Sequence, residues 1–151
     1  METSTLDSQV TGQDLREAMR HWASGVAVIT AGLDPQTRIG LVSNSFTSVS
    51  LDPPLVSWCV DRRSTSFEAW CQAPAFSIHI LDDDDAHLIP RFAARGTDKF
   101  ADLRTRTSEL GTPALNAGAA RLDCRTWKTY DGGDHLIMVG EVIRIQTRDH
   151  K

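Results

Sequence analysis

Hydroxyl and amide side chains are concentrated between Val42 and Ser50, directly after an apolar segment that begins at Ile39. The run holds five hydroxyl groups and one carboxamide within nine residues. Such groups, with neighbouring backbone N–H donors, suit a neutral ligand rich in acceptors, for example a flavin ring or its ribityl chain. A Ser/Thr-rich loop that only satisfies its own backbone has the same composition, so both interpretations stay open.

A second polar cluster, Asp61 to Ser66, follows the apolar segment Leu55 to Val60 and precedes a short helical pattern, Phe67 to Cys71. Hydroxyls and N–H groups at a helix start, beside two arginines, form a plausible cradle for a phosphate. An ordinary helix cap with exposed arginines explains the same residues equally well.

Five further residues in the second half of the chain carry groups that suit a binding site. Arg91 and Phe92 lie on a predicted helix, and Lys99 with Phe100 follows it. An arginine there suits a phosphate and an aromatic ring suits a ring ligand, although a surface cation beside a core aromatic is the ordinary alternative. His135 follows a Gly-Gly-Asp sequence at the head of a strand, where an exposed surface histidine is the simpler interpretation.

Composition bounds the class of protein. The chain has 151 residues and 40% apolar residues, enough for one globular domain with a single core. A net charge of −4 with interleaved signs argues against a nucleic-acid partner. The polar start lacks the features of a secretory signal, and no apolar run is long enough for a membrane span. Three unpaired cysteines at unrelated spacings favour reduced thiols, a cytoplasmic location and no metal site.

Hydrophobic periodicity predicts a helix that begins at Gln13 and ends at Gly25, followed by mainly β structure. Residues 1–12 are expected to be a flexible lead, and residues 13–151 a single domain. Short apolar segments with β-branched residues, separated by Pro-containing breaks, predict four strands: Val26–Thr30, Ile39–Ser45, Leu55–Val60 and Phe76–Leu81.

The second half of the chain predicts one more helix and a hairpin. Asp84 or Asp85 is expected to cap a helix that carries Leu88 and Phe92 on one side. The segments Ala120–Thr129 and His135–Gln146 flank an Asp-Gly-Gly turn whose glycines can take the positive φ of a hairpin. Many short strands with few helices predict an antiparallel barrel with helices outside. A doubly wound nucleotide fold is disfavoured, because the chain has neither glycine-rich phosphate motif.

The order of these segments resembles the flavin reductase-like family, the FMN-binding split barrels. The resemblance extends from Leu15 to Ile145 and rests on the following stretches: LREAMRHWASGVAVIT, GLVSNSFTSVSLDPPLVSWCVDRRSTSF, RFAARGTDKFADL and YDGGDHLIMVGEV. It implies a mainly β fold, an antiparallel and Greek-key-like split barrel with a few peripheral helices. It also implies an NADH- or NADPH-dependent reductase that supplies reduced FMN or FAD to a separate monooxygenase.

The resemblance carries roles to individual positions. It implies that His135 binds the nicotinamide and assists hydride transfer. It implies a homodimer as well, since each flavin site of this fold borders a dimer interface. The residues implied in flavin binding are Val42, Ser43, Asn44, Ser45, Thr47, Ser48, Cys59, Val60, Asp61, Thr65, Ser66, Arg91 and Phe92.

Members of the family commonly continue past the barrel with a strand that contributes to the nicotinamide side, whereas this chain stops at Lys151. That departure raises the alternative function, a flavin-binding carrier or sensor without turnover. A serine hydrolase is a weaker third hypothesis, because the sequence contains no G-x-S-x-G turn.

Overall fold

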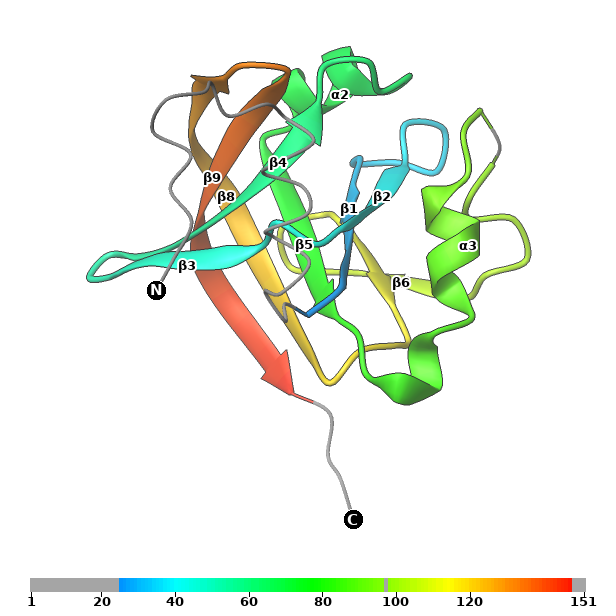
Figure 1. Ribbon diagram of the computed structural model, residues 1–151. Helices are drawn as coiled ribbons and strands as arrows, with labels where there is room; N and C mark the ends of the chain where they lie inside the picture. The colour runs from blue at the N-terminus through cyan, green and yellow to red at the C-terminus, as the bar shows by residue number, and fades with distance from the viewer. Residues whose placement is uncertain (1–24, 97, 148–151) are drawn as a thin grey trace, which may run out of the picture.

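A computed structural model describes residues 25–96 and 98–147. The predicted lead, residues 1–12, and the helix predicted to begin at Gln13 lie outside the described residues. The described part is mainly β (Figure 1). Its elements are β1 (Ala27–Ala31), β2 (Ile39–Ser43), β3 (Thr47–Leu51), β4 (Pro54–Asp61), α2 (Phe67–Gln72), β5 (Ala75–Ile80), the 3-10 turn η1 (Asp83–Asp85), α3 (Leu88–Ala93), β6 (Thr105–Thr107), β7 (Pro113–Leu115), β8 (Ala120–Gly132) and β9 (His135–Thr147).

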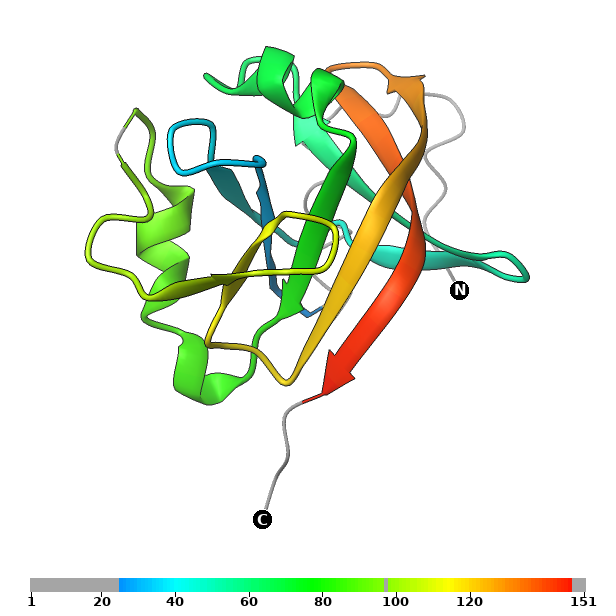
Figure 2. The ribbon, with the colours of Figure 1, turned by 180° about the vertical axis from the view of Figure 1, so that it is seen from behind.

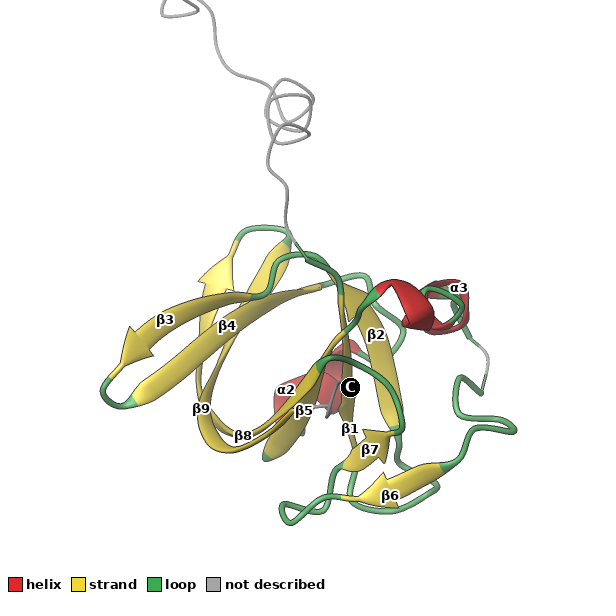
Figure 3. Cartoon of the chain, turned by 90° about the horizontal axis from the view of Figure 1, so that it is seen from below, coloured by secondary structure: helices red, strands yellow, loops and turns green. Residues whose placement is uncertain are grey.

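Seven strands form one antiparallel sheet in the order β2-β1-β5-β8-β9-β4-β3. The sheet curls, with the β3–β4 hairpin on one side and α3 with the β6–β7 hairpin on the other (Figure 3). The order ends in β2 on one side and β3 on the other, and β3 pairs only with the first half of β4, Pro54–Ser57. The second half of β4 and β2 do not pair, so the barrel is split between these two strands. The mainly β, antiparallel split-barrel fold predicted from the sequence is confirmed.

One face of the sheet encloses the main hydrophobic core. Along β4, Val56, Trp58 and Val60 are buried while the residues between them are half-buried, which is the period of a strand with one face inward. Trp58 contacts Trp70 of α2 and Phe76 of β5 edge to face, with ring centroids 4.9 and 5.5 Å apart. Burial of these rings holds α2 against the barrel.

The other face of the sheet is covered by α3 and the β6–β7 hairpin (Figure 2). Val28 of β1 packs there with Leu88, Phe92, Phe100 and Leu115 in a second hydrophobic cluster. Gly40 of β2 allows the close approach of α3, because a Cβ at this position would lie 2.7 Å from the Phe92 ring.

The predicted strands and helices largely correspond to observed elements. The four early strands became β1, β2, β4 and β5, and the late hairpin became β8–β9 with Gly133 at φ 80° in its turn. Strands β3, β6 and β7 were not predicted. The prediction that Asp84 or Asp85 caps the second helix was wrong. Asp82 caps η1 by accepting from the Asp84 N–H at 3.0 Å, and α3 begins at Leu88 with no side-chain cap.

The described helices are short. α2 and α3 have six residues each, and within residues 25–96 and 98–147 no helix has the length and apolarity that a bilayer span requires.

A buried histidine joins the layer of β6 and β7 to the sheet. His79 of β5 is fully buried, its Nδ1 lies 3.0 Å from the Val28 carbonyl oxygen, and its Nε2 accepts the Leu115 N–H at 3.0 Å. These two bonds require the neutral tautomer with the proton on Nδ1. Burial lowers the pKa of His79 to about 4.

The unfolding free energy is therefore expected to fall as the pH drops from 7 to 5.5. The unfolded histidine takes up a proton near its ordinary pKa of about 6.5, while the folded one resists protonation until about pH 4. The contribution of neutral His79 to the unfolding free energy is complete above the unfolded pKa and is lost as the pH falls. The unfolding free energy should decrease by about 1 kcal/mol between pH 7 and 5.5. Urea titrations of wild type and His79→Asn measure it.

The control is His87→Asn, at an exposed position. It should keep the wild-type pH dependence, whereas His79→Asn should lose most of it. An unchanged slope in His79→Asn would show that other groups cause the pH dependence.

Candidate active site

A cleft of about 960 Å³ lies at the split between β2 and β4. Its walls come from β2 and the following loop, from the end of β4, from α3 and from the β8–β9 turn. The lining residues are Val26, Leu41, Val42, Ser43, Asn44, Ser45, Cys59, Val60, Asp61, Ser64, Thr65, Ile89, Phe92, Ala93, Ala94, Arg95, Lys99, Gly132 and His135.

Ser45 fixes the loop that crosses the split. Its hydroxyl accepts the Cys59 N–H of β4 at 2.9 Å and lies 3.0 Å from the Ser43 hydroxyl. The Ser43 hydroxyl also accepts the Ser45 N–H at 3.2 Å. The hydroxyl-rich run thus satisfies part of its own backbone, as the simpler interpretation expected, and in doing so it builds one wall of the cleft.

His135 lies at the rim of the cleft, because the β4–β9 register pairs it with Asp61. Its Nδ1 lies 2.8 Å from Asp134 Oδ1, and this contact holds the pKa of Asp134 below its ordinary value. Hydrogen bonds from the Arg63 backbone and side chain lower the pKa of Asp61. Both carboxylates therefore remain charged beside the imidazole.

Two cations, Lys99 and Arg95, also line the cleft. Lys99 is half-buried, and its Nζ donates to the Gly40 and Phe92 carbonyl oxygens at 2.9 and 2.8 Å. Desolvation lowers the pKa of Lys99. Arg95 is exposed and donates a long bond of 3.4 Å to the Arg63 carbonyl oxygen. An ammonium with three N–H groups and two protein acceptors has one donor left for an anion.

The β4–α2 loop is tied to the β8–β9 turn by Arg62. Its Nε donates to the Gly133 carbonyl oxygen at 2.8 Å, and Nη2 contacts Asp131 at 2.6 Å. The Arg62 N–H also donates to the Asp134 carbonyl oxygen at 3.1 Å. Two walls of the cleft that are far apart in sequence are therefore held together by the backbone and side chain of one residue, Arg62.

The structure brings together most of the residues that the sequence predicts for flavin binding. Those that line the cleft are Val42, Ser43, Asn44, Ser45, Cys59, Val60, Asp61, Thr65 and Phe92, together with His135. Four predicted residues do not line it: Thr47 and Ser48 lie on β3, Ser66 lies at the start of α2, and Arg91 lies on α3.

Arg91 has a different environment from the one predicted. Its Nη1 donates to the Lys99 and Ala101 carbonyl oxygens at 3.2 and 2.6 Å. Arg91 therefore positions the segment that carries Lys99, and Lys99 itself reaches the cleft. The residues assigned to flavin binding from the sequence did not include Lys99, Arg95 or Ser64, although Lys99 and the Asp61–Ser66 cluster were noted as candidates. The available signal was a second pair of cations on either side of Gly96, after the predicted helix.

The donor set fits a ligand with a ring system, a polar chain and an anionic end. Leu41, Ile89 and Phe92 supply apolar walls, and Ser64 and Thr65 supply hydroxyls near the loop after β4. Lys99 and Arg95 supply positive charge for a phosphate. The cleft volume of about 960 Å³ is in the range that binds ligands of cofactor size.

Comparisons with known proteins agree with this geometry. The model of the "Flavin reductase like domain" family matches residues 19–151. The chain is 41% identical over 137 residues to "FMN reductase (NADH) SmoA" of Agrobacterium fabrum, covering 91% of this chain and 78% of that protein. It is 32% identical to the reductase subunit HsaB of a flavin-dependent monooxygenase of Mycobacterium tuberculosis, covering 91% and 73%.

The solved structures include the NADH:FAD oxidoreductase SgcE6 of Streptomyces globisporus. It superposes with a TM-score of 0.83 at 33% identity, covering 93% of this chain and 87% of that chain. A further structure of SgcE6 contains NAD and FAD fragments. The family model, the relatives and the split barrel with its cleft agree, and the chain belongs to the flavin reductase-like family.

Proposed function

We propose that this protein reduces FMN or FAD with NADH or NADPH and releases the reduced flavin to a separate monooxygenase. The observation that supports it best is the cleft, which joins the flavin-binding residues predicted from β2, β4 and α3 to His135 at one rim. Two relatives that match this chain over most of their own length are named as an NADH-dependent FMN reductase and as the reductase subunit of a monooxygenase.

The chemistry places few demands on the protein. A bound flavin supplies a ring that accepts a hydride from the nicotinamide. The residues of this chain bind and orient the two partners, which converts a random encounter into an aligned one. Lys99 and Arg95 hold the phosphate end, and the Ser45 loop shapes the wall along the ring. Asp134 fixes the ring orientation of His135 on the side where the nicotinamide enters.

If Lys99 and Arg95 bind the flavin phosphate, FMN binds more tightly than riboflavin. Arg95→Gln and Lys99→Met should each narrow that difference about tenfold, because a hydrogen bond to a charged group contributes roughly 1.5–3 kcal/mol. Fluorescence titration of each variant with both flavins measures it. Riboflavin is the internal control, since general loosening of the cleft weakens both ligands alike. Equal affinities of the wild type for the two flavins would contradict the assignment.

His135→Ala is expected to reduce kcat/KM for NADH by roughly tenfold to a hundredfold, or about 1.4–2.7 kcal/mol of transition-state stabilisation. Flavin affinity should stay within about threefold, because the Ser45 loop and the cations are untouched. The assay is anaerobic bleaching of flavin at about 450 nm on addition of NADH, which requires turnover.

His87→Ala, at an exposed position outside the cleft, is the matched control and should behave as wild type. Full NADH oxidation by His135→Ala would place the nicotinamide site elsewhere. A wild-type protein that binds flavin but bleaches none would instead be a carrier or sensor.

The proposal includes a homodimer. β3 is an edge strand of the sheet, and Val49 and Leu51 on it are 55% and 92% exposed, so this strand offers a second subunit both an unpaired edge and apolar side chains. The β3–β4 hairpin extends away from the barrel (Figure 1), in a position to meet a second subunit. A flavin slot that is open at the barrel split then gains a wall from its neighbour.

Val49→Lys with Leu51→Lys is expected to convert the dimer to a monomer, because two charges would be buried without partners. Sedimentation equilibrium measures the change. Leu33→Lys, at a position 61% exposed in the β1–β2 turn, is the control and should remain dimeric. A wild-type monomer that still reduces flavin would refute the dimer.

A further inference from the structure

A second cavity, of about 520 Å³, lies between the β6–β7 hairpin and the paired ends of β8 and β9. It shares no lining residue with the flavin cleft. Four arginines line it: Arg104 and Arg106 from the hairpin side, and Arg121 and Arg144 from the sheet. Glu109 is the one carboxylate among its lining residues. A positive cavity in a chain with a net charge of −4 calls for an explanation.

The sheet side of the cavity is a row of polar residues on one face. The register pairs His79 with Arg121, and Arg121 with Gln146. Two residues along, it pairs Ser77 with Asp123 and Asp123 with Arg144. The β6–β7 hairpin covers the part of this row that lies on β5, His79 and Ser77. The part on β8 and β9 is not covered and lines the cavity with Arg121, Arg144 and Gln146. The cavity therefore begins where the buried polar layer ends.

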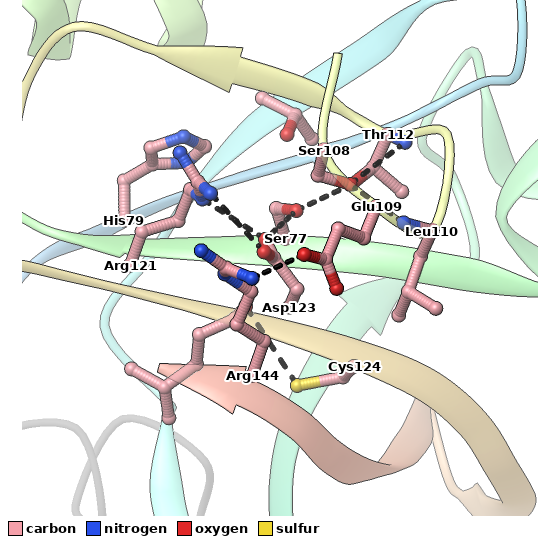
Figure 4. Close-up of polar contacts among 12 residues, drawn as sticks. Ser77, His79, Ser108, Glu109, Leu110, Thr112, Arg121, Asp123, Cys124 and Arg144 are labelled. Carbon is pink, nitrogen blue, oxygen red and sulfur yellow. Dashed lines mark hydrogen bonds and ion pairs between the residues drawn. The ribbon is translucent and has the colours of Figure 1, made fainter. Parts of the chain in front are cut away.

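Arg121 is held in place by that buried layer (Figure 4). Its Nε and Nη2 donate to the two Asp123 oxygens at 3.0 and 3.2 Å, and its side chain is only 17% exposed. Ser77 donates to Asp123 Oδ1 at 2.6 Å and lies 2.6 Å from the Thr112 hydroxyl. A guanidinium fixed by a buried carboxylate is pre-organised, so a ligand binds it with little loss of side-chain entropy.

The hairpin side carries positive charge that the described residues do not neutralise. Arg144 pairs with Glu109, whereas the side chains of Arg104 and Arg106 make no hydrogen bond or ion pair within residues 25–96 and 98–147. Ala114, Leu115 and Ala117 add apolar surface to the same cavity. Its volume of about 520 Å³ far exceeds that of a simple inorganic ion and lies in the range of small-molecule sites.

We propose that this cavity binds a small organic dianion, a dicarboxylate or a phosphomonoester, between the hairpin arginines and the sheet arginines. Guanidinium groups bind carboxylate and phosphate through paired N–H donors, and the side chains of Arg104 and Arg106 have these donors free. Arg121 and Arg144 line the same cavity and add the donors that Asp123 and Glu109 leave unused. The apolar residues contact the carbon framework. The site is independent of flavin reduction.

Isothermal titration calorimetry of the full chain at low ionic strength tests the proposal. The probes are terephthalate for a dicarboxylate, adenosine monophosphate for a phosphomonoester, and benzoate and inorganic phosphate as references. At least one dianion should bind tenfold or more tightly than benzoate and inorganic phosphate. Arg104→Gln with Arg106→Gln should weaken that binding at least tenfold, since each removes a charge-assisted contact. Both positions are exposed, so the fold is not at risk.

Arg125→Gln, an exposed arginine of β8 outside the cavity, is the matched control and should bind the dianion as wild type does. Equal binding of all four probes would show nonspecific ion association and overturn the proposal. So would the absence of binding, or an unchanged affinity in the double variant. A change of oligomeric state in the double variant would assign the cavity to a subunit interface. FMN affinity and NADH oxidation, measured on the same variants, should not change.

Discussion

The absence of pairing between β2 and β4 is the constraint on which the site depends. A closed barrel would satisfy every strand edge and leave no space between these strands. Here the loop after β2 crosses the split, and the Ser45 hydroxyl accepts the Cys59 N–H that a neighbouring strand would otherwise bind. At this point one side-chain hydrogen bond joins the loop after β2 to β4 in place of a ladder of backbone bonds. The cleft between the strands follows from that substitution.

The sheet carries two different layers, and each serves a different need. The inner face is packed with aromatic and aliphatic side chains around Trp58, which supplies most of the apolar burial. The outer face is partly polar, and His79, Ser77 and Asp123 are buried there with hydrogen-bond partners. Satisfied buried polar groups fix a unique arrangement but tolerate little change. The polar groups of the outer face therefore set the position of the β6–β7 hairpin, while α3, which forms one wall of the cleft, is held by the apolar cluster of Val28, Leu88 and Phe92.

Sequence patterns predicted the elements whose signals are local. The glycine turn predicted the β8–β9 hairpin, and runs of β-branched residues predicted β1, β4 and β5. β3 was hidden because its hydroxyl-rich composition is that of a loop, and its strand conformation comes from pairing with β4. β6 and β7 have three residues each, too few for a period to appear. The same locality explains the site: residues within one motif were assigned to it, whereas Lys99 enters the cleft through tertiary contacts with Arg91, Gly40 and Phe92.

The exchange of roles between Arg91 and Lys99 shows why a motif alone does not assign chemistry. Both are cations near the end of α3, and both suit a phosphate by type. Arg91 has planar, multiple donors, and it uses one nitrogen to bind two carbonyl oxygens of the loop after α3. Lys99, on that loop, has a compact ammonium that reaches over Gly40 into the cleft. The Arg91 guanidinium therefore holds the loop, and the Lys99 ammonium lies at the proposed phosphate site. Which cation takes which role depends on the side chain that the loop carries toward β2.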